Sequence, residues 1–116
     1  FLEVMKSAED NNVTKGPLVV HCRQEPILFM QLIFQSAGIG RTGTFCSVHS
    51  VLQKYWYDKQ KAPEQDPTVA IVEAIISLRF QRLGMVQSEE QYLFIHMAIN
   101  EGIANLNKYG QISKPK

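Results

Sequence analysis

The chain has 116 residues, of which 45% are apolar and 20% charged, and its formal net charge is +1. This size and composition predict at most one globular domain, and the balanced charge argues against a protein that binds nucleic acid or anionic membranes. Two cysteines cannot form the disulfide framework of a small secreted protein. The sequence shows neither a signal peptide nor a membrane-spanning run, and we expect a reducing, cytoplasmic setting. The chain does not begin with methionine, so we expect its true N-terminus to be missing.

The first 22 residues are predicted to hold one helix and one strand. Residues 1–9 carry apolar side chains at helical spacing, and residues 10–17 form a polar loop that ends in a Gly-Pro turn. Residues 18–22 are apolar and rich in valine, which is typical of a short buried strand. Cys22 stands at the end of this predicted strand.

A second apolar segment, residues 23–35, is harder to assign. Seven of the eight residues from 27 to 34 are apolar, a run too short to span a bilayer and suited to a strand or a buried hairpin. Its last two residues, Phe and Gln, are what a pyrimidine-rich splice acceptor ending in CAG encodes. We therefore hypothesise that this segment is a retained or mispredicted intron, which sequencing of the transcript would test.

A glycine-rich stretch follows, and its chemistry is that of an anion site. Three glycines and two threonines surround Arg41 between residues 36 and 45, immediately before a helical apolar pattern. Glycines let successive backbone N–H groups converge on a ligand, and the start of a helix adds free donors and a partial positive charge. Arg41 adds a planar fork that can grip two oxygens. The sequence therefore predicts a phosphate site here.

Two nucleotide-binding loops share letters with this stretch. Gly38, Gly40 and Gly43 match the spacing of the dinucleotide fingerprint, and Asp58 lies where its acidic residue would stand, but residues 44–57 read as a helix rather than as the second strand. A dinucleotide-binding domain therefore remains a weak alternative. A Walker loop is excluded, because a threonine follows Gly43 where that loop needs lysine.

Three helical segments are predicted after the loop. Residues 45–56 carry the first, with its N-terminus directed at the anion site. Residues 63–67 form a linker whose Asp66-Pro67 pair suggests an N-cap and a first helical residue for the second helix. That helix is expected to face inward through Val69, Val72, Ile76 and Phe80. The third runs from about residue 88 to residue 106 and is expected to face inward through Tyr92, Ile95, Ile99 and Ile103.

The letters on either side of the apolar segment resemble the signature of the protein tyrosine phosphatases. In that family His-Cys is followed directly by Ser-Ala-Gly-Ile-Gly-Arg-Thr-Gly, and here His21-Cys22 and residues 36–43 supply every letter. Removing residues 23–35 would place Cys22 and Arg41 at the family's Cys-x5-Arg spacing. A second resemblance lies in residues 79–92, which look like the family's glutamine loop. The variant around residues 39–45 leans toward tyrosine-specific members.

The resemblance implies a fold and its boundaries. We expect an α/β structure, a partial tyrosine phosphatase fold with one or few strands of a mixed sheet, a phosphate-binding loop and a helical C-terminal half. The catalytic-domain part would span residues 1–107 with an atypical insert at 23–35, and residues 108–116 would form a tail. In the family the phosphotyrosine-binding loop and most strands of the sheet lie N-terminal to this region, so we expect the chain alone to fold poorly.

The resemblance also implies roles for individual residues. Cys22 would attack phosphorus and form a phosphocysteine, with His21 helping to set its environment, and no metal or cofactor would be needed. Arg41 would clamp two phosphate oxygens, and Thr42 would stabilise the thiolate when it leaves. The phosphate would also be held by the backbone amides of Ser36, Ala37, Gly38, Ile39, Gly40 and Arg41.

Two glutamines complete the implied site. Gln87 and Gln91 would position the water that hydrolyses the phosphocysteine. For Gln91 the sequence leaves a second interpretation open, because Ser88 and Gln91 have the spacing of a helix capping box. Arg79 and Arg82 are interpreted as solvated or as braces of this loop.

The implied activity is hydrolysis of phosphotyrosine in protein substrates. We expect this activity to be impaired in the chain as it stands, because Arg23 and the residue after it occupy places where the cradle amides belong, and misplacing a catalytic group by about 1 Å can cost on the order of 100-fold. The family's general acid, an aspartate on a Trp-Pro-Asp loop, also lies N-terminal to this region. The alternative is a catalytically inactive module that binds phosphotyrosine or a partner protein.

Overall fold

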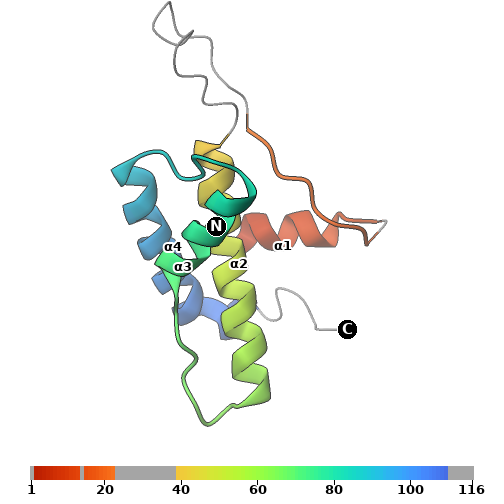
Figure 1. The fold of residues 1–116 in the computed structure, drawn as a ribbon. Coiled ribbons are helices and arrows are strands. Elements are labelled where there is room, and N and C mark those ends of the chain that lie inside the picture. Colours follow the sequence, from red (N-terminus) through yellow and green to blue (C-terminus); the bar gives the residue numbers. More distant parts are fainter. Residues whose placement is uncertain (1, 14, 23–38, 110–116) are drawn as a thin grey trace, which may run out of the picture.

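The computed structural model describes residues 2–13, 15–22 and 39–109, and in them the regular structure consists of four helices. These are α1 (Leu2–Asp10), α2 (Gly40–Lys61), α3 (Ile71–Gln81) and α4 (Glu89–Tyr109). In Figure 1, α2 runs through the middle of the molecule, with α3 and α4 toward one side and α1 toward the other. The longest helix thus provides the frame on which the others are arranged, and it packs against both α4 and α3.

The hydrophobic core lies where α2 meets α4. Val48 and Leu52 of α2 and Ile95 and Ile99 of α4 are fully buried, as is Met5 of α1. Val48 and Leu52 are four residues apart, as are Ile95 and Ile99, so the two side chains of each pair lie one above the other on the same helix face. The helices expected over residues 45–56 and from about residue 88 are therefore present.

Close packing of α2 and α4 depends on a glycine. A Cβ added at Gly102 would stand 2.7 Å from Leu52 Cδ1, which is closer than carbon atoms approach one another. Gly102 therefore lets Leu52 lie directly against the α4 backbone. This contact fixes the middle of α2 against α4.

The strand predicted for residues 18–22 does not form. This segment is extended but unpaired, and no strand occurs among the described residues. A strand is defined by hydrogen bonds to a neighbouring strand, and an isolated one is not stable in water. The mixed sheet expected from the family fold is therefore not seen in the described part of this chain, which is helical.

The start of α3 also differs from the prediction. α3 begins at Ile71, preceded by Ala70 without a side-chain cap, rather than at residue 67 after Asp66. The Asp66 carboxylate instead accepts a hydrogen bond from Lys59 Nζ at 2.9 Å. Because that carboxylate is engaged by α2, it does not cap a helix, and residues 62–70 remain a connection.

The inward face of α3 was predicted wrongly. Ile71 and Ile75 are buried, whereas Val72 and Ile76 are about half exposed and Phe80 is 88% exposed. Apolar residues occur on more than one side of this helix, so spacing alone does not identify the side that meets α2. In α4 the expected face is correct at its two central isoleucines, while Tyr92 at its start is 36% exposed.

Candidate functional site

The N-terminus of α2 is built as an open donor site. Ile39 precedes the helix in a helical conformation and provides no side-chain cap, and its carbonyl accepts the Gly43 N–H at 2.9 Å. Thr44 Oγ1 donates to the Gly40 carbonyl at 2.9 Å and so lies away from the helix end. The first amides of a helix have no partner within the helix. The amides in the first turn of α2, together with the positive end of the helix dipole, therefore point toward the place where an anion would bind.

Cys22 lies beside this helix end, although residues 23–38 separate it from Ile39 in the chain. Burial acts to raise the pKa of the Cys22 thiol, but the hydroxyl and amide of Thr42 and the charge and amide of Arg41 outweigh burial. The pKa of Cys22 is therefore held below its ordinary value. The fold thus brings together the cysteine and the arginine of the interrupted signature.

The hydroxyl of Thr42 is the least satisfied polar group near the thiol. Thr42 is 5% exposed, and its Oγ1 has no hydrogen-bond partner among the described residues. Hydrogen bonding by this hydroxyl is nevertheless the largest of the effects that lower the pKa of the Cys22 thiol. A buried hydroxyl without a partner is costly, and a thiolate beside it would supply the missing acceptor.

Both predicted glutamines lie over the start of α2. A Cβ added at Gly40 would stand 2.6 Å from Gln87 Oε1 and 2.8 Å from Gln91 Nε2. The absence of a side chain at Gly40 is therefore what allows the two amide groups to approach the helix end. The structure thus groups Gln87 and Gln91 with Gly40 of the predicted signature.

Gln91 also forms the capping box that the sequence left open. Its Oε1 accepts the backbone N–H of Gln87 at 2.8 Å and that of Ser88 at 3.2 Å, and its own N–H donates to Ser88 Oγ at 3.2 Å. Because two amides occupy the oxygen, the amide group of Gln91 presents its Nε2 to the site as a donor. Capping and a contact with the site are thus combined in one side chain.

The connection between α3 and α4, residues 82–88, which we call the α3–α4 loop, rests directly on α2. A Cβ added at Gly43 would stand 2.5 Å from the backbone nitrogen of Val86, and the Val86 N–H donates to the Ile39 carbonyl at 3.4 Å. A side chain at position 43 would push this loop away. The absence of a side chain at Gly43 therefore allows the α3–α4 loop, and with it the two glutamines, to lie close to the start of α2.

The remaining predicted residues are placed as follows. His21 is exposed. Ser36, Ala37 and Gly38 lie outside the described residues.

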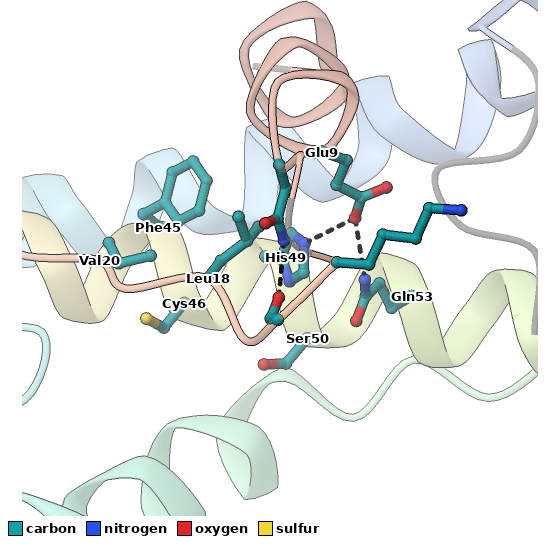
Figure 2. A pocket seen from close by; sticks show the side chains of 11 residues that line it. Glu9, Leu18, Val20, Phe45, Cys46, His49, Ser50 and Gln53 are labelled. Carbon is teal, nitrogen blue, oxygen red and sulfur yellow. Dashed lines mark hydrogen bonds and ion pairs between the residues drawn. The ribbon is translucent and has the colours of Figure 1, made fainter.

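A second cavity lies elsewhere, between α1, residues 15–20 and one side of α2, and sequence reasoning did not find it. It has a volume of about 510 Å3, and none of its described lining residues was predicted for phosphate chemistry. Figure 2 shows Glu9 of α1 reaching His49 and Gln53 of α2: Glu9 Oε1 lies 3.3 Å from His49 Nε2 and accepts a hydrogen bond from Gln53 Nε2 at 3.2 Å. This cluster forms only because α1 packs close to α2 in the folded chain, so local sequence patterns do not predict it.

Cys46 lines that cavity and differs from Cys22. Burial raises the pKa of the Cys46 thiol, and no other contribution opposes it. Cys46 therefore behaves as a small apolar side chain. In the described part of the chain, no group of three or more potential ligands could hold a metal ion, and no helix there is long and apolar enough to cross a membrane.

Comparison with known proteins gives a consistent result. The family model for protein-tyrosine phosphatases matches residues 1–101. The chain is 36% identical over 104 residues to a tyrosine-protein phosphatase of Dictyostelium discoideum, covering 88% of this chain and 23% of that protein. It is 35% identical to a protein-tyrosine-phosphatase of Arabidopsis thaliana, covering 90% and 25%, and 37% identical to receptor-type tyrosine-protein phosphatase F of Mus musculus, covering 87% and 4%. The chain thus spans a quarter or less of these relatives, and no solved structure gives a significant match.

Proposed function

Because this chain belongs to the protein-tyrosine phosphatase family, we propose that it carries the nucleophile and the phosphate-binding arginine of a cysteine-dependent phosphatase that acts on phosphotyrosine in proteins. The observation that carries this proposal is the lowered pKa of Cys22 beside the start of α2. A thiolate at neutral pH is what nucleophilic attack on phosphorus requires. The named relatives are tyrosine phosphatases, which supports the same reaction.

In the first step the Cys22 thiolate attacks phosphorus. An S–P bond forms while the bond from phosphorus to the tyrosine oxygen breaks, and that oxygen takes a proton from an acid outside this chain. Arg41 grips two of the phosphate oxygens, and the amides in the first turn of α2 stabilise their charge. No metal or cofactor takes part.

In the second step water attacks phosphorus and the S–P bond breaks, while the proton that the water loses passes to the conjugate base of the acid that protonated the tyrosine oxygen. Gln87 Oε1 accepts a hydrogen bond from this water, and Gln91 Nε2 donates one to it or to a phosphate oxygen. The Cys22 thiolate leaves, and the unpartnered Thr42 hydroxyl donates to it, which makes it a better leaving group. The reaction returns the thiolate with which it began.

Residues 23–35 and 36–38 bear on how fast this reaction runs. The family's cradle uses the amides directly after the cysteine, and in this chain the insert occupies those positions. We expect an intact nucleophile with an incomplete cradle, hence slow turnover. Slow chemistry with retained binding would make the protein a phosphotyrosine-binding module, which is the alternative function.

Cysteine replacement in the whole protein tests the proposal. Cys22→Ser should abolish hydrolysis of a small aryl phosphate, whereas the matched variant Cys46→Ser should retain it, because the Cys46 thiol lies away from the site and is protonated. Binding of a phosphotyrosine peptide without hydrolysis by the wild-type protein would favour the binding module. Equal loss of hydrolysis in both variants would contradict the assignment of Cys22.

The cellular setting forms part of the proposal. A reactive thiolate such as that of Cys22 requires a reducing compartment, which indicates the cytoplasm or the cytoplasmic side of a receptor-type protein. Its partner would be a protein that carries phosphotyrosine.

A further inference from the structure

The α3–α4 loop contains a strained residue next to Gln87. Val86 has a φ of 65°, in the left-handed region that β-branched residues avoid, and it is 3% exposed. Gly84, two residues earlier, has a φ of 82°, which glycine accepts without cost. Strain of this kind persists only where surrounding contacts hold the backbone in place. Neighbouring groups must therefore hold the backbone of Val86 in this conformation.

Arg79 of α3 provides the strongest of these contacts. Its Nε donates to the Met85 carbonyl at 2.8 Å, and one of its terminal nitrogens donates to the Val86 carbonyl at 2.8 Å. These two carbonyls belong to the peptide groups before and after Val86. The two peptide groups are joined at the Val86 Cα, so their relative orientation is determined by the backbone dihedral angles of Val86. A planar guanidinium that holds both carbonyls fixes this orientation and therefore keeps Val86 in its strained conformation.

The second of these peptide groups is held at both ends. Its carbonyl, from Val86, is bound by Arg79, and its N–H, from Gln87, donates to Gln91 Oε1 at 2.8 Å. The direction in which the Gln87 side chain leaves the backbone is set by this peptide group. With the group fixed, Gln87 Oε1 reaches the start of α2, where a Cβ on Gly40 would lie 2.6 Å from it.

We propose that Arg79 is a positioning residue for the second chemical step. By holding Val86 in its strained conformation, it places Gln87 where it can orient the attacking water. This inference rests on the proposed function, because Gln87 has this task only in a phosphatase. Arg79 itself touches neither the phosphate nor the water, so its loss should affect hydrolysis of the phosphocysteine and spare its formation.

Lysine cannot replace this arginine. A lysine ammonium is a point charge and cannot hold two carbonyls in one plane, so Arg79→Lys keeps the charge and removes the clamp. Val86 would then relax from its strained φ and turn Gln87 away from the site. Glycine at position 86 is not strained at this φ, so the same lysine substitution should cost less in a Val86→Gly background.

The test measures the two steps separately in the whole protein. Rapid quenching after mixing with a small aryl phosphate gives the rate of phosphocysteine formation and the rate of its hydrolysis. We expect Arg79→Lys to slow hydrolysis by about 10- to 100-fold, on the scale of a misplaced catalytic group, with little change in formation. The loss should be smaller in the Val86→Gly background. The control is Ser77→Ala, at an exposed position two residues before Arg79 in α3, which should leave both rates close to wild type.

A second readout does not depend on catalysis. Hydrogen exchange at the amides of residues 86–88 should be faster in Arg79→Lys than in wild type, because the clamp no longer holds the loop. Faster exchange without slower hydrolysis would overturn the positioning role, and so would an equal slowing of both steps. A wild-type protein that forms no phosphocysteine would overturn the proposed function itself, and this result would be recognised before any variant is compared.

Discussion

The two cysteines of this chain show how position rather than residue type determines reactivity. Cys22 lies at a helix N-terminus beside Arg41 and Thr42, and its pKa is lowered, whereas Cys46 is half buried on one side of α2, and its pKa is raised. The thiolate is the reactive form of either residue. Cys22 should therefore react with electrophiles faster than Cys46 does at the same pH.

This difference predicts the pH dependence of labelling. Labelling of Cys22 by iodoacetamide should reach half its maximal rate at a lower pH than labelling of Cys46, as measured by mass spectrometry of the two peptides. Arg41→Ala removes a positive charge that stabilises the thiolate, so it should move the midpoint for Cys22 to higher pH and leave that of Cys46 in place. Identical midpoints for the two thiols would contradict the environment described for Cys22.

Gly40 and Gly43 should respond differently to substitution by alanine. At Gly40 the new Cβ would meet only the ends of two flexible side chains, Gln87 and Gln91, which can swing away. Gly40→Ala should therefore reduce turnover, on the order of 100-fold if the water is misplaced by about 1 Å, with a change in unfolding free energy below about 1 kcal/mol.

Gly43→Ala provides the matched comparison. Its Cβ would meet the backbone of Val86, which cannot swing away, so we expect a loss of about 1–3 kcal/mol in unfolding free energy. Urea unfolding and aryl phosphate turnover of the two variants separate these effects. A Gly40→Ala protein that is fully active would mean that the glutamines do not need to approach the helix end.

The helices themselves were largely predictable from local sequence signals. The apolar spacing after residue 44 predicted α2, and Ser88 with Gln91 predicted the cap of α4, because both signals act within one or two turns of a helix. The start of α3 was missed because Asp66 is bound by Lys59, a contact between elements that the local pattern does not contain. The strand at residues 18–22 failed for the same reason, since a strand needs a neighbour.

The candidate site was predictable as a set of residue types but not as an arrangement. Cys22, Arg41 and Thr42 were identified from the letters of the signature, and the structure places them near one another despite the segment between them. Of the two interpretations of Arg79, the one as a brace of the loop is confirmed, but its acceptors, the carbonyls of Met85 and Val86, could not be read from spacing, because they depend on a backbone conformation that β-branched residues avoid. Strain of this kind becomes visible only in three dimensions.

The capping box of α4 should contribute measurably to stability. Ser88→Ala removes the hydroxyl that accepts the Gln91 N–H, and loss of such a cap costs about 1 kcal/mol. We expect a corresponding decrease in the urea midpoint of the whole protein. The control is Ser77→Ala, an exposed position within α3, where alanine should be neutral or slightly stabilising. An equal effect at both positions would mean that the cap is not formed in solution.

At the scale of the whole molecule, α2 links the core to the site. Its middle is fixed against α4 through Val48 and Leu52, while its N-terminal turn meets Cys22 and the α3–α4 loop. A rigid helix held at its centre keeps the groups at its end in a constant position, which phosphoryl transfer requires. The core and the site therefore depend on the same element.

Residues 23–35 should lower the rate of phosphate hydrolysis more than they lower the stability of the fold. Closing a loop of this length costs about 2 kcal/mol in chain entropy, so its removal should raise the unfolding free energy by no more than about that amount. Its deletion from the whole protein restores the Cys-x5-Arg spacing and should raise turnover of an aryl phosphate on the order of 100-fold. Equal turnover with and without the segment would show that it does not disturb the cradle.

The central claim is that Cys22 is the nucleophile, and the most direct measurement of it is the covalent intermediate. The whole protein would be mixed with an aryl phosphate, quenched in acid and digested, and the peptide that contains residue 22 would be analysed by mass spectrometry. The account predicts one phosphate on Cys22 and none on Cys46. Turnover that continues while Cys22 carries no phosphate, or persists in Cys22→Ser, would contradict it.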